Sequence, residues 1–238
     1  MYLLFEHQTT RDHALALRLL RYMVRIWESR LNRHAAPARL PVILPVVLAQ
    51  NAEVWELSPR FSSLLDIPAD FGDELRACIP DFTFRLIQLA GLSFESIRGT
   101  PAGIMTLRVM KAERIARLLD DPVWDEALLM QLPRETLEFI IRYLLRADID
   151  KDAFDHRVST IAQPELQTTT MTLADQLRDE GLQKGLQEGI LEALEIRFGP
   201  IPDGLREVVA AMDDVTQLRG LHKASIQATS LEEFSRSL

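Results

Sequence analysis

The sequence of 238 residues contains a single cysteine, Cys78, which excludes an internal disulfide and a cysteine-rich zinc site. Its five histidines are scattered, and no two have the spacing of a metal-ligating pair such as HxxxH. No apolar run reaches the roughly 18 residues that span a bilayer, and the N-terminus lacks the basic segment of a signal peptide. These absences predict a soluble protein, without membrane contact, in a reducing, cytoplasmic compartment.

Acidic residues outnumber basic ones by 35 to 27 overall, but positive charge is concentrated near the N-terminus. The net charge is −8, and a content of 47% hydrophobic residues predicts a chain that folds around a core. Only Asp12 and Glu28 oppose the seven arginines between positions 11 and 39, which are Arg11, Arg18, Arg21, Arg25, Arg30, Arg33 and Arg39. This basic segment is compatible with local phosphate contacts, and a solvated arginine-rich helix face explains it equally well.

The first fifty residues predict a strand, a helix and a second strand. Residues 2–8 form an apolar run that ends in polar side chains, and a helix with one apolar face follows to about Leu31. Residues 42–48 are continuously apolar, as in a strand covered on both faces, although Pro45 indicates an edge position or a bulge. A strand–helix–strand unit of this length predicts two parallel neighbours in one sheet.

The remainder of the chain is predicted to be mainly helical. A third strand is expected at 82–89, and residues 164–172 lack periodicity and predict a linker. We therefore predict two domains, residues 1–165 and 166–238. The expected helices are 102–120, 122–131, 134–147, 151–163, 173–198, 202–211, 214–226 and 230–236.

The end of the first predicted strand carries the candidate chemistry. Side chains alternate along a strand, so Glu6 and Gln8 share one face and His7 lies on the other. A carboxylate can ligate Mg²⁺, and an amide two residues further on can orient a water or a phosphate oxygen. Such a pair is half of a metal-dependent phosphodiesterase site, but alone it is more often a solvated strand end. For His7 we expect a packed, hydrogen-bonded side chain rather than a ligand.

Several stretches resemble the YhgA-like putative transposases, also called recombination-promoting nucleases, a family of the PD-(D/E)XK nuclease superfamily. The resemblance covers roughly residues 2–150, and the tail from Glu180 to Gly199 is similar to the C-terminal extension of such proteins. It implies an α/β, partial PD-(D/E)XK core followed by an α-helical C-terminal region, with Mg²⁺-dependent DNA endonuclease activity connected with recombination. The stretches begin with Tyr2-Leu-Leu-Phe-Glu-His-Gln-Thr-Thr, Leu17-Arg-Leu-Leu-Arg-Tyr-Met, Leu40-Pro-Val-Ile-Leu-Pro, Pro80-Asp-Phe-Thr-Phe and Arg98-Gly-Thr-Pro.

Carried over to this sequence, the family pattern makes Glu6 the second acidic metal ligand. Gln8 stands where the superfamily more often has a catalytic lysine, whose charge an amide cannot supply. The pattern also implies DNA phosphate contacts for Arg18, Arg21 and Arg25, which share a helix face that could instead be merely solvated.

The superfamily's first acidic residue, an Asp on the preceding strand, has no counterpart in this sequence. A site with one carboxylate is a poor Mg²⁺ site, so cleavage is expected to be impaired. The sheet edge beside residues 2–8 would be open. Pairing with a partner, a misassigned start codon and a degraded gene copy each explain this pattern.

The second hypothesis for function is a non-catalytic remnant that forms oligomers or binds a partner through its helical tail. Gly181, Gly185 and Gly189 recur every four residues and would give the helix at 173–198 a flat face. That face would allow close approach of a second copy, so we expect a homo-oligomer; the alternative is a weak linker helix.

Overall fold

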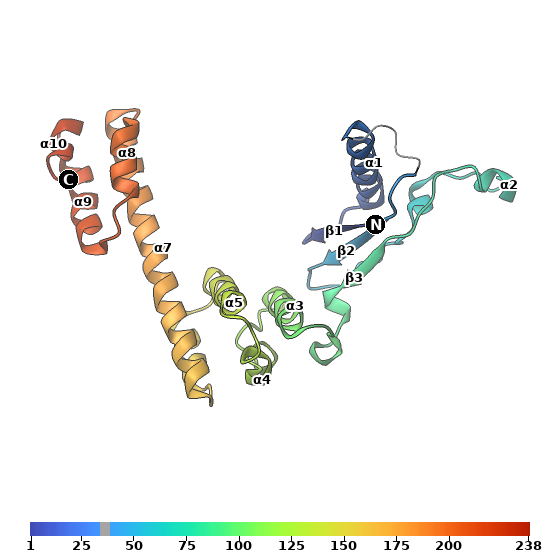
Figure 1. The fold of residues 1–238 in the computed structure, drawn as a ribbon, viewed down its shortest axis with the longest axis horizontal. Coiled ribbons are helices and arrows are strands. Elements are labelled where there is room, and N and C mark those ends of the chain that lie inside the picture. The colour runs from blue at the N-terminus through green and yellow to red at the C-terminus, as the bar shows by residue number, and fades with distance from the viewer. Residues whose placement is uncertain (34–38) are drawn as a thin grey trace. The chain divides into compact units, whose positions relative to one another are not determined.

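The computed structural model describes residues 1–33 and 39–238, which group into two compact units, Met1–Gln131 and Leu132–Leu238 (Figure 1). The first unit contains a small parallel sheet with helices, and the described residues of the second unit form helices and their connections. The expectation of an α/β region followed by a helical region is therefore confirmed. None of the described helices is both long enough and apolar enough to cross a membrane.

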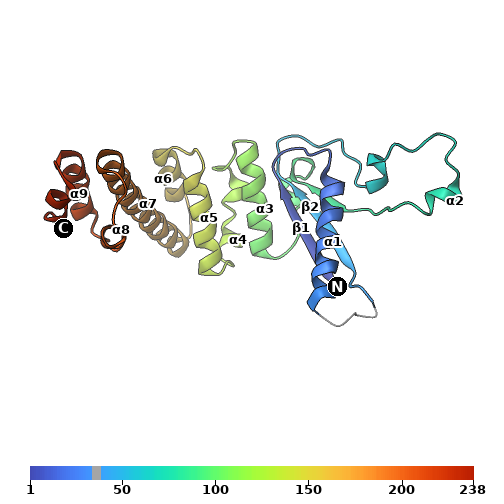
Figure 2. The same cartoon turned by 90° about the horizontal axis from the view of Figure 1, so that it is seen from above.

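The sheet of the first unit has the strand order β1-β2-β3, with both pairs parallel. The strands are β1 (Tyr2–Gln8), β2 (Ile43–Ala49) and β3 (Arg85–Gln88). Helix α1 (Leu15–Arg33) connects β1 to β2 and lies against one face of the sheet (Figure 2). Its residues Leu15 and Leu19 pack with Val47 of β2 in one hydrophobic core. The predicted strand–helix–strand unit is thus confirmed.

Pro45 lies in β2, the central strand, and pairs with Leu4 without a bulge, so the expected bulge is wrong, but its other side has no neighbouring strand among the described residues, as the expected edge position requires. The backbone N–H of Tyr2 donates to the carbonyl of Val42, and the backbone N–H of Gln50 donates to the carbonyl of Gln8. Even-numbered residues from 42 to 50 therefore direct their backbone N–H and C=O groups towards β1, and odd-numbered ones direct them towards β3. The backbone of Pro45 therefore faces β3, whose pairing begins only at Val46. The missing N–H of this proline points to the side of β2 where no strand has yet begun, which makes it tolerable.

The predicted third strand is shorter than 82–89. Phe84 N donates to Pro59 O, and Arg60 pairs with Thr83 in an isolated antiparallel bridge. Phe82 stacks on Phe61 with ring centroids 5.4 Å apart. These contacts divert residues 82–84 to the loop that contains the short 3₁₀ helix η1 (Phe61–Leu64), so the ladder with β2 starts at Arg85.

The remaining elements of the first unit are short, except for α3 (Pro101–Arg114), which ends well before the predicted residue 120. Thr100 caps α3 by accepting from Gly103 N, and Pro101 occupies the first turn. Ala116, with φ of 53°, interrupts the predicted helix. The short elements are α2 (Asp73–Arg76), η2 (Leu89–Gly91), η3 (Phe94–Ser96), η4 (Asp121–Val123) and α4 (Glu126–Leu129).

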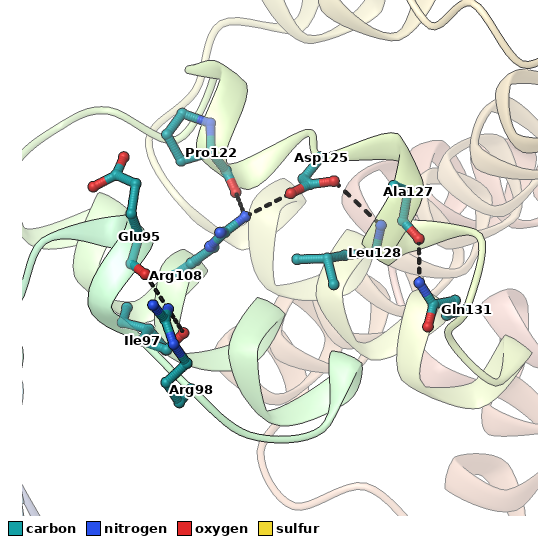
Figure 3. Close-up of polar contacts among 9 residues, drawn as sticks. All are labelled: Glu95, Ile97, Arg98, Arg108, Pro122, Asp125, Ala127, Leu128 and Gln131. Atoms are coloured by element: carbon teal, nitrogen blue, oxygen red, sulfur yellow. Dashed lines mark hydrogen bonds and ion pairs between the residues drawn. The ribbon is translucent and has the colours of Figure 1, made fainter.

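A single arginine ties α3 to the segments that follow it (Figure 3). Arg108 Nη1 donates to Pro122 O at 3.1 Å and to Asp125 Oδ2 at 2.9 Å. Asp125 also caps α4 through Leu128 N, so one carboxylate serves both the helix end and the arginine. Nearby, Arg98 donates to the backbone oxygens of Glu95 and Ile97, which closes the turn before α3.

The second unit is built around one long helix, α7 (Pro164–Phe198), so the predicted linker at 164–172 is wrong. Leu166, Thr170 and Leu173 are buried at three- and four-residue spacing, and the buried Thr170 hides this period from a hydrophobicity scan. Pro164 suits the first helical turn because the missing N–H needs no partner there. The helix ends at Gly199, whose φ is +84°.

The other helices of the second unit pack against the two halves of α7. The C-terminal half forms a core with the last three helices through Ile190, Leu194, Val209, Leu218 and Phe234. The bounds are α5 (Arg134–Arg146), α6 (Lys151–Ser159), α8 (Asp203–Ala210), α9 (Val215–Gln227) and α10 (Leu231–Ser235).

Candidate functional site

Glu6 and Gln8 lie on the sheet face that α1 covers, at the C-terminal end of β1. Gln8 Nε2 donates to Glu6 Oε1 at 2.8 Å, and both residues are partly buried. The predicted sharing of one face is therefore observed. The amide of Gln8 is engaged by the neighbouring carboxylate, which it holds in place.

Arg18 joins this pair to a second carboxylate. Its Nη2 lies 3.3 Å from Glu6 Oε1, and its Nη1 lies 2.8 Å from Asp12 Oδ2. The exposed fractions of the three side chains are 30% for Arg18, 21% for Glu6 and 28% for Asp12. Partial burial strengthens these ion pairs relative to those of fully solvated groups.

Sequence reasoning did not place Asp12 at this site. Asp12 Oδ1 accepts from Ala14 N at 2.8 Å in the turn that leads into α1. This bond points the other carboxylate oxygen along the helix towards Arg18, six residues further on. The only sequence signal was an acid just before a helix whose first turn carries an arginine. We call Glu6, Gln8, Asp12 and Arg18 the Glu6 cluster.

Arg21 and Arg25 do not contact the Glu6 cluster. Both are exposed, and both border a shallow hollow of about 400 Å³ on the outer face of α1. The apolar side chains of Leu17, Leu20 and Val24 complete it, together with Glu28. The predicted arginine stripe is thus divided: Arg18 is committed to carboxylates, while Arg21 and Arg25 face outward. The side chain of Arg33 lies outside the described part.

His7 belongs to a different network on the opposite side of the sheet. Its Nε2 is 2.7 Å from Gln50 Oε1, so the ring nitrogen donates. Gln50 is only 2% exposed and donates to Glu113 Oε2 at 2.8 Å and to Met110 O at 2.9 Å. The expected hydrogen bond of His7 is observed, but the side chain is exposed, so the expectation of a packed histidine is wrong. The buried amide of Gln50 links the end of β1 to α3.

The described residues do not by themselves fit a complete Mg²⁺ site. Among them, no group of three histidine, cysteine, aspartate or glutamate side chains is arranged to hold a metal ion. Glu6 Oε1 is shared between Gln8 and Arg18, and Asp12 is engaged by Ala14 N and Arg18. The guanidinium already balances much of the charge that would attract a cation.

The geometry so far defines an α/β unit with a carboxylate–amide pair at the C-terminal end of a parallel strand and arginines on the adjoining helix. The family model described as "Putative transposase, YhgA-like" matches residues 1–133 of the 238. The chain belongs to this family. The match ends two residues beyond the first compact unit, Met1–Gln131. No solved structure matches the chain significantly.

Proposed function

We propose that this protein acts on DNA as an endonuclease-type protein of the PD-(D/E)XK kind, with impaired cleavage. The observation that carries the proposal is the Glu6–Gln8 pair at the C-terminal end of β1, in a chain of this family. In open parallel sheets, ligands bind beyond the carboxyl ends of the strands. Gln8, Ala49 and Gln88 are aligned at that end, which supports a ligand site beside the Glu6 cluster.

DNA would be held by the outward arginines of α1. Arg21 and Arg25 are one helical turn apart and exposed, as phosphate contacts require. The net charge of −8 makes the rest of the protein repel a polyanion. Binding should therefore depend strongly on these two side chains and on salt concentration.

Impaired cleavage follows from the Glu6 cluster itself. Hydrolysis of a phosphodiester assisted by Mg²⁺ needs carboxylate ligands whose charge is available to the ion. Here Glu6 is the sole strand carboxylate of the cluster, and Arg18 is its counter-ion. Gln8 orients the Glu6 carboxylate by donating one hydrogen bond to it. A further acidic ligand would be required for efficient cleavage.

The alternative function is that of a non-catalytic protein that acts through partners, and the Arg18–Glu6 ion pair favours it, because a neutralised acid attracts metal poorly. Self-association through residues 173–198 is the corresponding proposal for a partner. A Cβ at Gly181 or Gly185 would meet no atom within 4 Å, so this side of α7 is open. Gly189 instead faces His222 of α9.

The test measures the affinity of the full chain for a fluorescently labelled DNA duplex, by fluorescence anisotropy, at several salt concentrations. Arg21→Gln with Arg25→Gln should weaken binding and lower the salt slope by about two, one per lost phosphate contact. Arg76→Gln with Arg219→Gln removes two exposed charges elsewhere and is the matched control. Equal loss in both double variants would contradict a DNA site on α1.

A further inference from the structure

The second unit contains a cleft of about 450 Å³ that is lined by residues of α5, α6 and α7. Figure 2 shows these three helices next to one another. The cleft lies outside the region that the family model matches and shares no residue with the Glu6 cluster. Its volume is within the range of sites for small organic ligands, about 300–1,000 Å³.

The lining of this cleft is strongly cationic, in contrast to the acidic chain as a whole. Arg142 and Arg146 are four residues apart on α5, and Arg178 and Lys184 extend from α7. Lys151, the first residue of α6, is the fifth basic residue. Of the described residues that line the cleft, Glu180 is the sole acid. Such a concentration of charge raises the local concentration of anions.

Two of the five cations are already paired. Arg142 Nη2 donates to Glu138 at 3.1 Å and to Glu180 at 3.2 Å, and these hydrogen bonds, with the one to Glu138 foremost, raise the pKa of Arg142. Arg178 contacts Asp155 at 2.7 Å and Asp175 at 3.3 Å. These ion pairs hold the two arginine side chains in the walls of the cleft, and they neutralise most of the positive charge that Arg142 and Arg178 could offer to a ligand.

The other three cations, Arg146, Lys151 and Lys184, are exposed. Within the part of the chain that the structure describes, none of them forms an ion pair. They come from three different helices and border one cleft, so a ligand there meets three uncompensated positive charges. A phosphate group, with up to two negative charges and several acceptor oxygens, matches this arrangement.

The interior of the cleft is apolar. Leu145 and Ile149 line it and are partly exposed, whereas Leu144, Phe154 and Leu177 are buried in its wall. The guanidinium of Arg178 lies 5.4 Å from the centre of the Phe154 ring, and the Arg178 side chain is 25% exposed. An accessible guanidinium beside apolar side chains favours stacking of an aromatic base.

We propose that this cleft binds a nucleotide, with the phosphate held by Arg146, Lys151 and Lys184 and the base against the apolar lining. The nucleotide can be free in solution or part of a single-stranded nucleic acid. The site is independent of the proposed DNA contacts of α1, because none of its residues lies on that helix.

Gly181 offers a way to block the cleft without changing its charge. It lies on α7 between Arg178 and Lys184 and lines the cleft, and an added Cβ would meet no atom within 4 Å. Gly181→Leu therefore places a side chain in the cleft with no backbone clash, and leucine is also the better helix former.

The experiment is titration of the full chain with a fluorescent adenine nucleotide, with inorganic phosphate as competitor and a short oligo(dT) as the second probe. Lys184→Gln and Arg146→Gln should each weaken binding roughly tenfold, the loss expected for one charge-assisted hydrogen bond. Gly181→Leu should abolish binding of the nucleotide. Lys223→Gln, an exposed lysine on α9, makes the same charge change away from the cleft and should leave the affinity unchanged.

The two probes distinguish a free nucleotide from a nucleotide within a single strand of nucleic acid. Tight binding of the free nucleotide assigns a soluble ligand, while binding of oligo(dT) alone assigns a strand of nucleic acid; both must be lost in Gly181→Leu. Circular dichroism of each variant confirms that the helices remain. The proposal is overturned if no probe binds at millimolar concentration, or if Lys223→Gln weakens binding as much as Lys184→Gln. Because α1 is unaltered throughout, failure here leaves the DNA proposal standing, and the reverse also holds.

Discussion

The guanidinium of Arg18 lies 3.3 Å from the carboxylate of Glu6, the residue on which the proposed chemistry depends. The same arginine contacts Asp12, so one cation connects a strand end to the turn before α1. Binding of any metal ion at Glu6 would have to compete with this contact, which makes Arg18 a positioning residue of the site.

The coupling between Glu6 and Arg18 can be measured directly. We predict that a double-mutant cycle of Glu6→Gln and Arg18→Gln gives a coupling free energy of about 1 kcal/mol, since both side chains are partly exposed. Urea unfolding followed by tryptophan fluorescence is the measurement. Trp27, Trp55 and Trp124 all lie within Met1–Gln131, so the signal reports on the first unit alone. Additive effects of the two changes would mean that the ion pair contributes no stability.

Gln50 is the buried polar residue on which the His7 network depends. Gln50→Met keeps the volume but leaves His7, Glu113 and the Met110 carbonyl each without one partner. We predict destabilisation by about 1–2 kcal/mol, because three partly buried hydrogen bonds are lost while their former partners remain accessible to water. Gln131→Met, which removes one exposed bond to Ala127 O, is the control and should change stability by only a few tenths of a kcal/mol. The same urea titration measures both.

The pKa of Asp81 lies below its ordinary value, primarily because of a hydrogen bond from Arg60 at 2.6 Å and further because Ser62 N donates to it. A lowered folded-state pKa contributes stability above the unfolded value of 3.8, and this contribution is lost as pH falls through the folded-state pKa. We predict that Asp81→Asn is less stable than the wild type at pH 6 and that this difference shrinks below pH 3.8. A difference that is constant between pH 6 and pH 3 would contradict this assignment.

Substitutions at two glycines of α7 are expected to change the stability of the second unit in opposite directions. Gly185→Ala should stabilise the second unit by up to about 1 kcal/mol, because an added Cβ meets nothing and alanine favours the helix. Gly189→Leu should destabilise it by about 1–3 kcal/mol, because a Cβ there already lies 3.4 Å from His222 Nε2 of α9. Thermal unfolding by circular dichroism measures both. Stabilisation by the leucine would show that α9 is not closely packed on this residue.

The fold was predictable from the sequence in those segments where hydrophobic residues recur with the period of a helix or strand and are also the residues that become buried. The period of α1 and the apolar run of β2 gave the parallel unit, and the alternation of Glu6 and Gln8 gave their common face. The start of α7 was missed because Thr170 is polar yet buried, so burial there does not follow hydrophobicity.

The remaining features depend on contacts between distant residues. Asp12 joins the site only because the turn before α1 folds back on Arg18, which no spacing rule indicates. The cationic cleft collects side chains from three helices, so its charge cannot be read from any one segment. Interactions of this kind depend on the tertiary fold rather than on local periodicity.

Cleavage at the Glu6 cluster can be measured as nicking of supercoiled plasmid by the purified chain over a range of Mg²⁺ and Mn²⁺ concentrations. Wild type is compared with Glu6→Gln and with Glu74→Gln, an exposed glutamate of α2 in the same unit. We predict slow, metal-dependent nicking that Glu6→Gln reduces to background and that Glu74→Gln leaves unchanged. Nicking that persists in Glu6→Gln would contradict this prediction, because the Glu6 cluster would then not be the site of cleavage.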